Sequence, residues 1–231
     1  PSTSLTPKFC LSIQASWDLD CIRPEMGYTC NIALPSTPYA RVSFATTTGS
    51  SSAKGRRKER DHKSFCYMLK DLSSECFLPI GAGGGLHSLD NAKMLFDSGA
   101  DKLILNTSVY ENPKLIEDLY GIYGQQAIIA SVDVKETKSG VYNVYTHNGT
   151  KKACSIEVYQ ERITKNKCIG ELYLNSMERD GTGHGYDINM LKSFTNLNEK
   201  LPIILAGGAG KTSHIIEALL IDGLDACATA H

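Results

Sequence analysis

The feature that most constrains the fold is an internal repeat. Residues 78–108 and 201–231 share one pattern: Leu-Pro, apolar residues, paired glycines, a segment with helical spacing, a glycine, an aspartate and a short apolar run. The equivalent pairs are Gly83 and Gly207, Gly84 and Gly208, Gly99 and Gly223, and Asp101 and Asp225. The copies lie about 124 residues apart, far beyond the ~20–50-residue period of solenoid repeats. The repeat therefore favours a barrel built from two similar halves.

From Phe65 onward, apolar strands alternate with helical segments, which is typical of a parallel sheet buried on both faces. We expect the first helix of the series to be capped by Ser88 and closed by Gly99. A hairpin is expected over 139–152, with Asn148-Gly149 as its turn. The expected strands are 76–85, 101–108, 126–135, 170–176, 201–208 and 225–230, and the expected helices are 88–100, 112–124, 155–166, 186–197 and 211–223.

The first 64 residues are less regular. Two weaker apolar runs, 7–14 and 40–46, bring the expected strand count to eight. We therefore predict a single (β/α)₈ barrel domain over 1–231, irregular over 1–64 and incomplete at its C-terminus. Its active site should lie at the C-terminal ends of the strands. The basic run 54–63 is interpreted as a solvated loop or helix start, with a phosphate or nucleic-acid patch as the alternative.

Several function classes are disfavoured by the sequence. Residues 204–213, "ILAGGAGKTS", resemble the phosphate loop of nucleotide hydrolases, but the required first glycine is Leu205. The net charge of −1 gives no electrostatic basis for binding nucleic acid or a charged membrane. The eight cysteines form no Cys-x-x-Cys pair, so we expect no metal, no cofactor and a reducing, cytoplasmic location. There is no stretch of 18 apolar residues.

The paired glycines lie where a strand gives way to its helix. Backbone N–H groups without neighbouring side chains can approach a phosphate, and a helix N-terminus adds a partial positive charge. Two such loops in opposite halves predict a ligand with a phosphate at each end. The alternative is that the glycines only permit tight turns.

Polar residues at the strand ends are the candidates for chemistry. Asp133 ends an apolar strand, where partial desolvation would raise its pKa toward a useful acid/base value. Its alternative role is a helix cap or an ion pair with Lys135. Asn106 and Thr107 can donate hydrogen bonds to a phosphate. Asp180 is either a second acid/base or a residue that orders its loop.

Four segments together resemble one family: "GAGGGLHSLDNAKMLFDSGADKLILNTSVYENPKLI", "SVDVK", "RDGTGHGYD" and "LAGGAGK". They are similar to the cyclase subunit of imidazole glycerol phosphate synthase, over about 65–225. The resemblance implies a (β/α)₈ barrel that takes a bis-phosphorylated ribotide. It also implies a glutaminase partner under the barrel, whose ammonia crosses the core, cleaves the substrate and closes an imidazole ring for histidine synthesis.

The resemblance also assigns residue roles. Asp133 would be the catalytic acid on the fifth strand. Lys102 and Glu171 would belong to a charged ammonia gate, and Asp101 would lie beside the glutaminase. The implied phosphate contacts are Gly84, Gly85, Asn106 and Thr107 at one end and Asp180, Gly181, Gly207 and Gly208 at the other.

The chain departs from the family pattern in its first strand. Ser12 stands where the family has a second catalytic aspartate, and Thr46 replaces an aspartate of the second strand. The chain also stops at His231, before the family's last helix. Two alternatives follow: a diverged paralogue that passes ammonia to a sugar amidotransferase in surface-polysaccharide synthesis, and a non-catalytic phosphate-binding scaffold.

Overall fold

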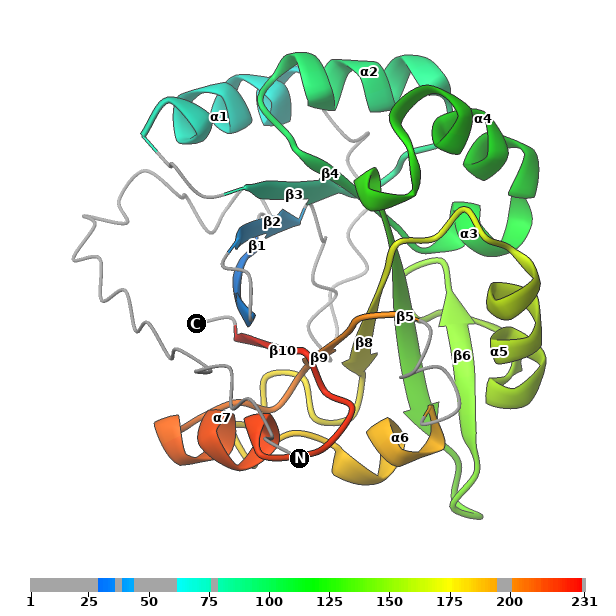
Figure 1. Cartoon of the computed structure of the whole chain (residues 1–231). Helices are drawn as coiled ribbons and strands as arrows, with labels where there is room; N and C mark the ends of the chain where they lie inside the picture. The colour runs from blue at the N-terminus through cyan, green and yellow to red at the C-terminus, as the bar shows by residue number, and fades with distance from the viewer. Residues whose placement is uncertain (1–28, 36–38, 44–61, 76–78, 195–200, 230–231) are drawn as a thin grey trace, which may run out of the picture.

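The computed structural model describes residues 29–35, 39–43, 62–75, 79–194 and 201–229. Within them, eight strands close a ring in the order β1, β2, β3, β4, β5, β8, β9 and β10, with β10 paired again to β1 (Figure 1). This closed ring confirms the predicted barrel. The ring strands are β1 (Thr29–Pro35), β2 (Tyr39–Ser43), β3 (Ile80–Gly83), β4 (Lys102–Leu105), β5 (Ile128–Glu136), β8 (Glu171–Ser176), β9 (Ile203–Ala206) and β10 (Ala226–Thr229).

The start of the barrel differs from eight successive strand–helix units. Seven ring strands pair in parallel, but β1 is antiparallel to both of its neighbours, β2 and β10. Only three residues separate β1 from β2, whereas a parallel connection needs a dozen or more. The sequence did not predict β1, while β2 overlaps the expected strand 40–46. The other expected strand, 7–14 with Ser12, lies outside the described residues, as does Thr46.

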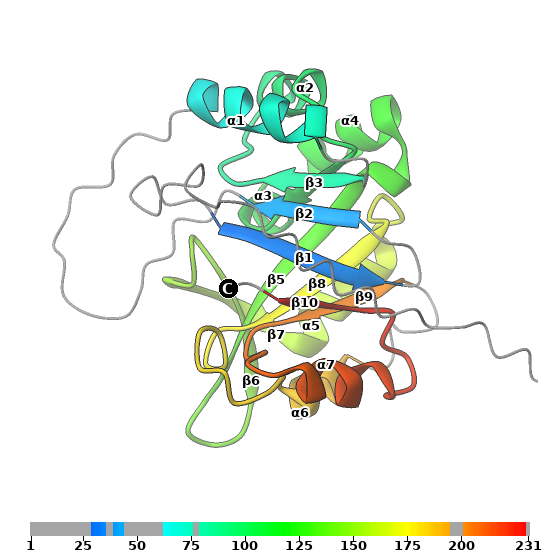
Figure 2. The ribbon, with the colours of Figure 1, turned by 90° about the vertical axis from the view of Figure 1, so that its left-hand side faces the viewer.

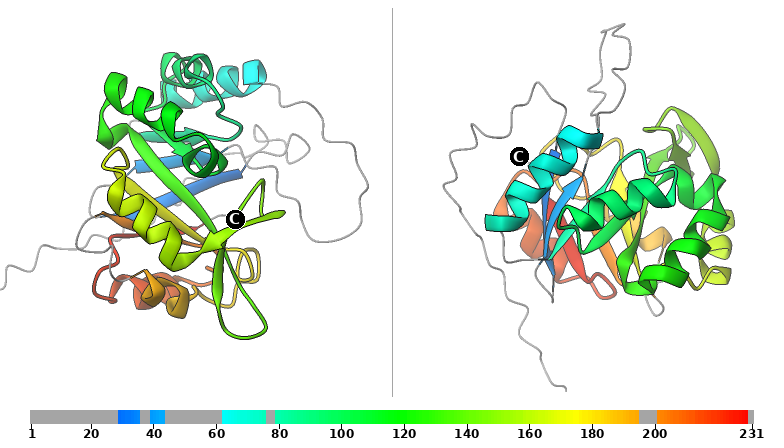
Figure 3. Two further views of the ribbon diagram at one scale, coloured as in Figure 1. Left: turned by 90° about the vertical axis from the view of Figure 1, so that its right-hand side faces the viewer. Right: turned by 90° about the horizontal axis from the view of Figure 1, so that it is seen from above.

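Helices cover the outside of the ring. Figures 1 and 3 show α1, α2 and α4 on one side and α6 and α7 on the opposite side. The predicted cap of α2 is confirmed, because the Ser88 hydroxyl accepts a hydrogen bond from the Asn91 N–H at 3.2 Å. The basic run ends in the first turn of α1, and its residues 54–61 are not described. The bounds are α1 (His62–Glu75), α2 (Leu89–Asp97), α3 (Thr107–Glu111), α4 (Pro113–Tyr123), a 3₁₀ turn (Gln125–Ala127), α5 (Ile156–Lys165), α6 (Ile188–Ser193) and α7 (Thr212–Leu219).

A hairpin extends the sheet beside β5, as the sequence predicted (Figure 2). Strand β6 (Tyr142–Thr146) pairs antiparallel with β5 and with β7 (Lys151–Ser155). Three successive residues have positive φ, His147 (54°), Asn148 (56°) and Gly149 (74°), and the Thr150 N–H donates to the His147 carbonyl at 3.3 Å, which places Asn148 and Gly149 at the two central positions of a β-turn. The Asn-Gly turn is therefore confirmed.

The apolar residues form two layers, as strand alternation requires. One cluster fills the space between the strands and the helices and includes Leu103, Ala130 and Leu172. A smaller cluster comes from the opposite face of the strands and fills the barrel interior. Its members are Ile104, Ile129, Tyr173, Ile204, Ala206, Ala226 and Ala228.

The internal repeat has a structural counterpart in two aspartates. The Asp101 carboxylate accepts the Ile80 N–H at 2.7 Å, and the Asp225 carboxylate accepts the Ile203 N–H at 2.9 Å. Each aspartate also donates its own N–H to the carbonyl of the same isoleucine. Both aspartates thus tie the start of one strand to the start of the preceding strand.

Candidate active site

Asp133 lies near the C-terminal end of β5, between side chains from the two neighbouring strands. It is in register with Asn175 of β8, whose side-chain amide donates to one carboxylate oxygen at 3.1 Å. The amide of Asn106, which directly follows β4, donates to the other oxygen at 2.9 Å. The carboxylate is therefore held in one orientation from both sides.

The environment favours the protonated form of this carboxyl. Burial is the largest effect and raises the pKa of Asp133 above its ordinary value of 3.8. The hydrogen bonds from Asn175 and Asn106 lower this pKa, and the charge of Asp180 raises it, so that the net shift is upward. Burial also raises the pKa of Asp180, which the Gly181 N–H partly offsets. Two carboxyls with raised pKa values at one strand-end face are candidates for proton transfer.

Lys102 and Glu171 lie at the opposite end of the barrel, where β4 and β8 begin. Their side chains form a largely buried ion pair. Glu171 is in register with Ile129, so Asp133 lies four residues further along the sheet, about 13 Å at ~3.3 Å per residue. The structure thus separates this charged pair from Asp133 by the apolar interior. Asp101, immediately before β4, is exposed and ties β3 to β4 as described above.

The first glycine loop follows β3. Gly84 and Gly85 both have positive φ, 113° and 67°, which side chains rarely adopt. The loop is fixed from α3, because the Ser108 hydroxyl donates to the Leu86 carbonyl. Asn106 and Thr107 lie at the start of the same α3. The structure therefore brings these four predicted residues to neighbouring strand ends.

The second glycine loop follows β9 and packs backbone to backbone on the loop after β8. The Gly185 N–H donates to the Gly208 carbonyl at 2.7 Å. A Cβ on Gly208 would lie 2.2 Å from the Gly185 oxygen, and one on Gly207 would lie 2.8 Å from the Ser176 oxygen. Asp180 and Gly181 belong to the β8 loop, so this second predicted set is also brought together.

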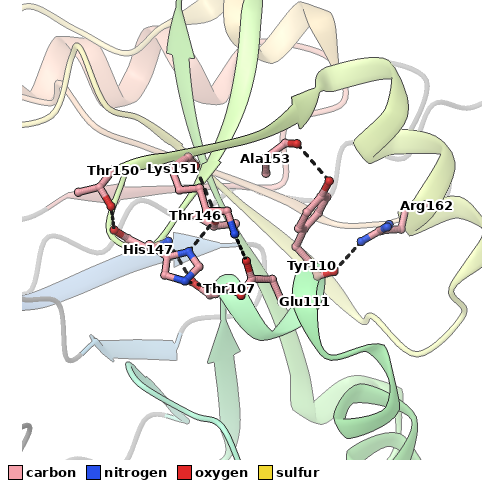
Figure 4. A network of polar contacts seen from close by, with 9 residues as sticks. All are labelled: Thr107, Tyr110, Glu111, Thr146, His147, Thr150, Lys151, Ala153 and Arg162. Atoms are coloured by element: carbon pink, nitrogen blue, oxygen red, sulfur yellow. Dashed lines mark hydrogen bonds and ion pairs between the residues drawn. The ribbon is translucent and has the colours of Figure 1, made fainter.

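The β6–β7 hairpin packs on α3 through polar contacts (Figure 4). The His147 N–H donates to the Thr107 hydroxyl at 3.1 Å, and Lys151 pairs with Glu111 at 2.8 Å. From α5, Arg162 donates to the Tyr110 carbonyl at 2.6 Å. The sequence reasoning did not anticipate these contacts.

Asn175 is the site residue that the sequence reasoning missed. A signal was present, because "KLILN" (102–106) and "ELYLN" (171–175) both run from a charged residue through three apolar residues to an asparagine. The first positions form the ion pair at the barrel floor, and the last positions are the two donors to Asp133. In each copy of this shorter repeat, the first residue therefore marks the floor of the barrel, and the last residue marks the end where Asp133 lies.

The described part of the chain offers neither a metal centre nor a membrane-spanning helix. No group of three or more His, Cys, Asp or Glu side chains is arranged to hold a metal ion there. None of the helices described is both long and apolar enough to cross a membrane.

Three known relatives of this chain are all named as subunits of imidazole glycerol phosphate synthase. A 43% identical relative from Parasynechococcus marenigrum, named "Putative imidazole glycerol phosphate synthase subunit hisF2", aligns over 76% of this chain and 64% of its own length. The imidazole glycerol phosphate synthase subunit HisF of Leptospira biflexa is 34% identical over 87% of this chain and 76% of its own length. That of Alkaliphilus metalliredigens is 34% identical over 71% and 64%. The chain thus spans about two thirds to three quarters of the length of these relatives.

The family model described as "Histidine biosynthesis protein" matches residues 56–231. This range contains Asp133, both glycine loops and every ring strand except β1 and β2. With the barrel, the strand-end carboxylates and the named relatives, it shows that the chain belongs to the histidine biosynthesis protein family, with HisF-type cyclase subunits as its relatives.

Proposed function

We propose that this chain is an ammonia-dependent cyclase that acts on a bis-phosphorylated ribotide and produces imidazole glycerol phosphate. The observation that carries this proposal is Asp133, held by Asn106 and Asn175 between two glycine loops. A carboxyl with a raised pKa in that place is suited to moving a proton at the reacting atoms. The two glycine loops are suited to one phosphate each.

The ammonia would come from a glutaminase that docks at the floor of the barrel. Family membership and the charged pair of Lys102 and Glu171 support this part of the proposal. The pair occupies the strand starts, at the opposite end of the interior from Asp133. Asp101, exposed beside it, would belong to the docking face.

One observation favours a second candidate function, ammonia transfer to a sugar amidotransferase by a diverged paralogue. The family resemblance places Ser12 on an aspartate of the family pattern, and a hydroxyl does not change charge near neutral pH. The 43% identical relative also bears a second subunit number in its name. A chain that lacks this first-strand carboxylate would bind the ribotide but turn it over slowly.

Turnover with ammonium as the nitrogen source tests the cyclase proposal. We expect weak turnover of the bis-phosphorylated ribotide, because loss of a well-placed acid/base costs roughly 10²–10⁴ in rate. Ser12→Asp should raise the rate, and Asp133→Asn should abolish it while ribotide binding survives. Absent turnover in both the unmodified chain and Ser12→Asp, with intact binding, would favour the amidation role. Robust turnover in the unmodified chain would show that Ser12 does not replace a required acid.

A further inference from the structure

Helix α3 needs support from outside itself. It spans only Thr107–Glu111, and helices this short are unstable on their own because nucleation is costly. The side chain of its N-cap residue, Asn106, makes no capping hydrogen bond and donates to Asp133 instead. The position of Thr107 therefore depends on contacts made by other elements.

The β6–β7 hairpin supplies the first set of contacts (Figure 4). Glu111, the last residue of α3, pairs with Lys151 of β7 at 2.8 Å, and its second oxygen lies 3.6 Å from His147 Nε2. The hydrogen bond from Lys151 lowers the pKa of Glu111, and the charge of His147 lowers it further. Both ends of α3 are thus joined to the hairpin, Thr107 through the His147 N–H and Glu111 through Lys151.

Helix α5 and β7 hold Tyr110, the fourth of the five residues of α3. The Arg162 guanidinium donates to the Tyr110 carbonyl at 2.6 Å and lies 4.3 Å from the centre of the Tyr110 ring. Such a cation over an aromatic face adds attraction beyond the hydrogen bond. The Tyr110 hydroxyl donates to the Ala153 carbonyl of β7 at 3.1 Å. The short helix α3 is therefore held by three segments that follow β5 in the sequence: the turn between β6 and β7, the strand β7 and the helix α5.

The contact at Thr107 also orients its hydroxyl. A threonine hydroxyl has one proton to donate and two lone pairs. One lone pair accepts the His147 N–H, so the proton is left for another acceptor. A phosphate oxygen beside the Gly84–Gly85 loop would be such an acceptor.

We propose that the β6–β7 hairpin and α5 position α3 so that the Thr107 hydroxyl meets one phosphate of the ligand, with Lys151 and Arg162 as positioning residues. This inference rests on the proposed two-phosphate function. It applies to the Gly84–Gly85 end only. Within the described residues, neither Lys151 nor Arg162 makes a hydrogen bond or ion pair to the loops after β8 and β9.

The test measures each phosphate site separately. Backbone amide resonances of Gly84–Gly85 and of Gly207–Gly208 in the full ¹⁵N-labelled chain are followed during titration with inorganic phosphate. In Lys151→Met/Arg162→Met, we expect the dissociation constant reported by Gly84–Gly85 to rise roughly five- to tenfold, as for loss of one ion pair and one charged hydrogen bond. The constant reported by Gly207–Gly208 should stay within twofold.

Two further variants control for general damage. Lys165→Met removes an exposed ion pair with Glu161 from the same α5 (2.6 Å) and should leave both sites unchanged. Lys151→Arg keeps the charge and should retain the Gly84–Gly85 constant within twofold. An unchanged Gly84–Gly85 constant in the double variant, or equal weakening at both sites, would overturn the positioning role. If added phosphate shifts the amide resonances of neither glycine pair in the unmodified chain, the phosphate sites themselves are overturned, and this inference with them.

Discussion

Replacing Gly208 by alanine tests whether the two loops of the second half-barrel really pack backbone to backbone. The new Cβ would lie 2.2 Å from the Gly185 carbonyl oxygen and 3.0 Å from the Arg179 Cβ. The nearest atom belongs to the backbone, so a rotamer change cannot relieve the contact. Gly208 also has a φ of 100°, a conformation that side chains rarely adopt.

The expected cost follows from these two effects. Overpacking costs about 1–3 kcal/mol, and a left-handed backbone conformation costs an L-residue roughly 1–2 kcal/mol. Alanine also restricts the unfolded chain more than glycine does, which offsets about 0.4–1 kcal/mol of this cost. We therefore expect Gly208→Ala to lower the free energy of unfolding by roughly 2–4 kcal/mol.

Alanine variants at two other glycines separate the cost of overpacking from the cost of the backbone conformation. Gly181 has a φ of 72°, and a Cβ added there would meet nothing within 4 Å beyond its chain neighbours, so Gly181→Ala should cost only the backbone strain, about 1 kcal/mol. Gly121 lies within α4 in open space and has no positive φ, so Gly121→Ala should stabilise by roughly 0.5–1 kcal/mol.

Equilibrium urea unfolding followed by circular dichroism measures all three variants. The slope of free energy against urea should match that of the unmodified chain, so that midpoints report stability alone. If Gly208→Ala costs no more than Gly181→Ala, the close contact between Gly208 and Gly185 is refuted. The order of the three midpoints, with Gly208→Ala lowest and Gly121→Ala highest, is the result that supports it.

Two further predictions concern charged groups. Because burial raises the pKa of Asp133, the native state keeps this proton where the unfolded chain has lost it; stability should therefore fall as pH rises from about the ordinary value of 3.8 through the raised native pKa. In parallel urea titrations, Asp133→Asn should show a smaller decline, because of the two carboxyls only Asp180 then keeps a raised pKa, and an identical pH dependence in both proteins would contradict the burial argument. Lys102→Glu should weaken ammonia coupling to a co-expressed glutaminase, because it places two carboxylates at the barrel floor, while calorimetry finds phosphate-ligand binding unchanged. Joint loss of coupling and phosphate binding would indicate misfolding rather than a gate.

Local features of the fold were predictable where neighbouring residues decide the backbone. The Ser88 cap of α2 and the Asn148-Gly149 turn depend on residues within three or four positions of one another, so the sequence carries their full signal. Strands β3, β4, β5, β8, β9 and β10 were readable because strands covered on both faces are continuous apolar runs. The place of Asp133 at a strand end followed from the same runs.

Other features depend on which segments meet in space. Strand β1 was missed, and its antiparallel direction follows from the short connection to β2 and its pairing with β10, which lies almost 200 residues away. Helix α3 was also missed, since five residues carry little periodicity. Its contacts with Lys151 and Arg162 join residues 40 and 52 positions apart in the sequence.

The sequence by itself determined the repeated strand–helix units, the two glycine loops and the acid at the end of β5. Each of these features lies within one continuous stretch of residues, and the local conformation there is set by the hydrophobic period or by glycines at the turn. Only the tertiary structure decided that Asn106 and Asn175 hold Asp133 from both sides, and that the β6–β7 hairpin holds α3. These contacts join side chains from different strands, and closure of the barrel, rather than any local pattern, brings those strands together.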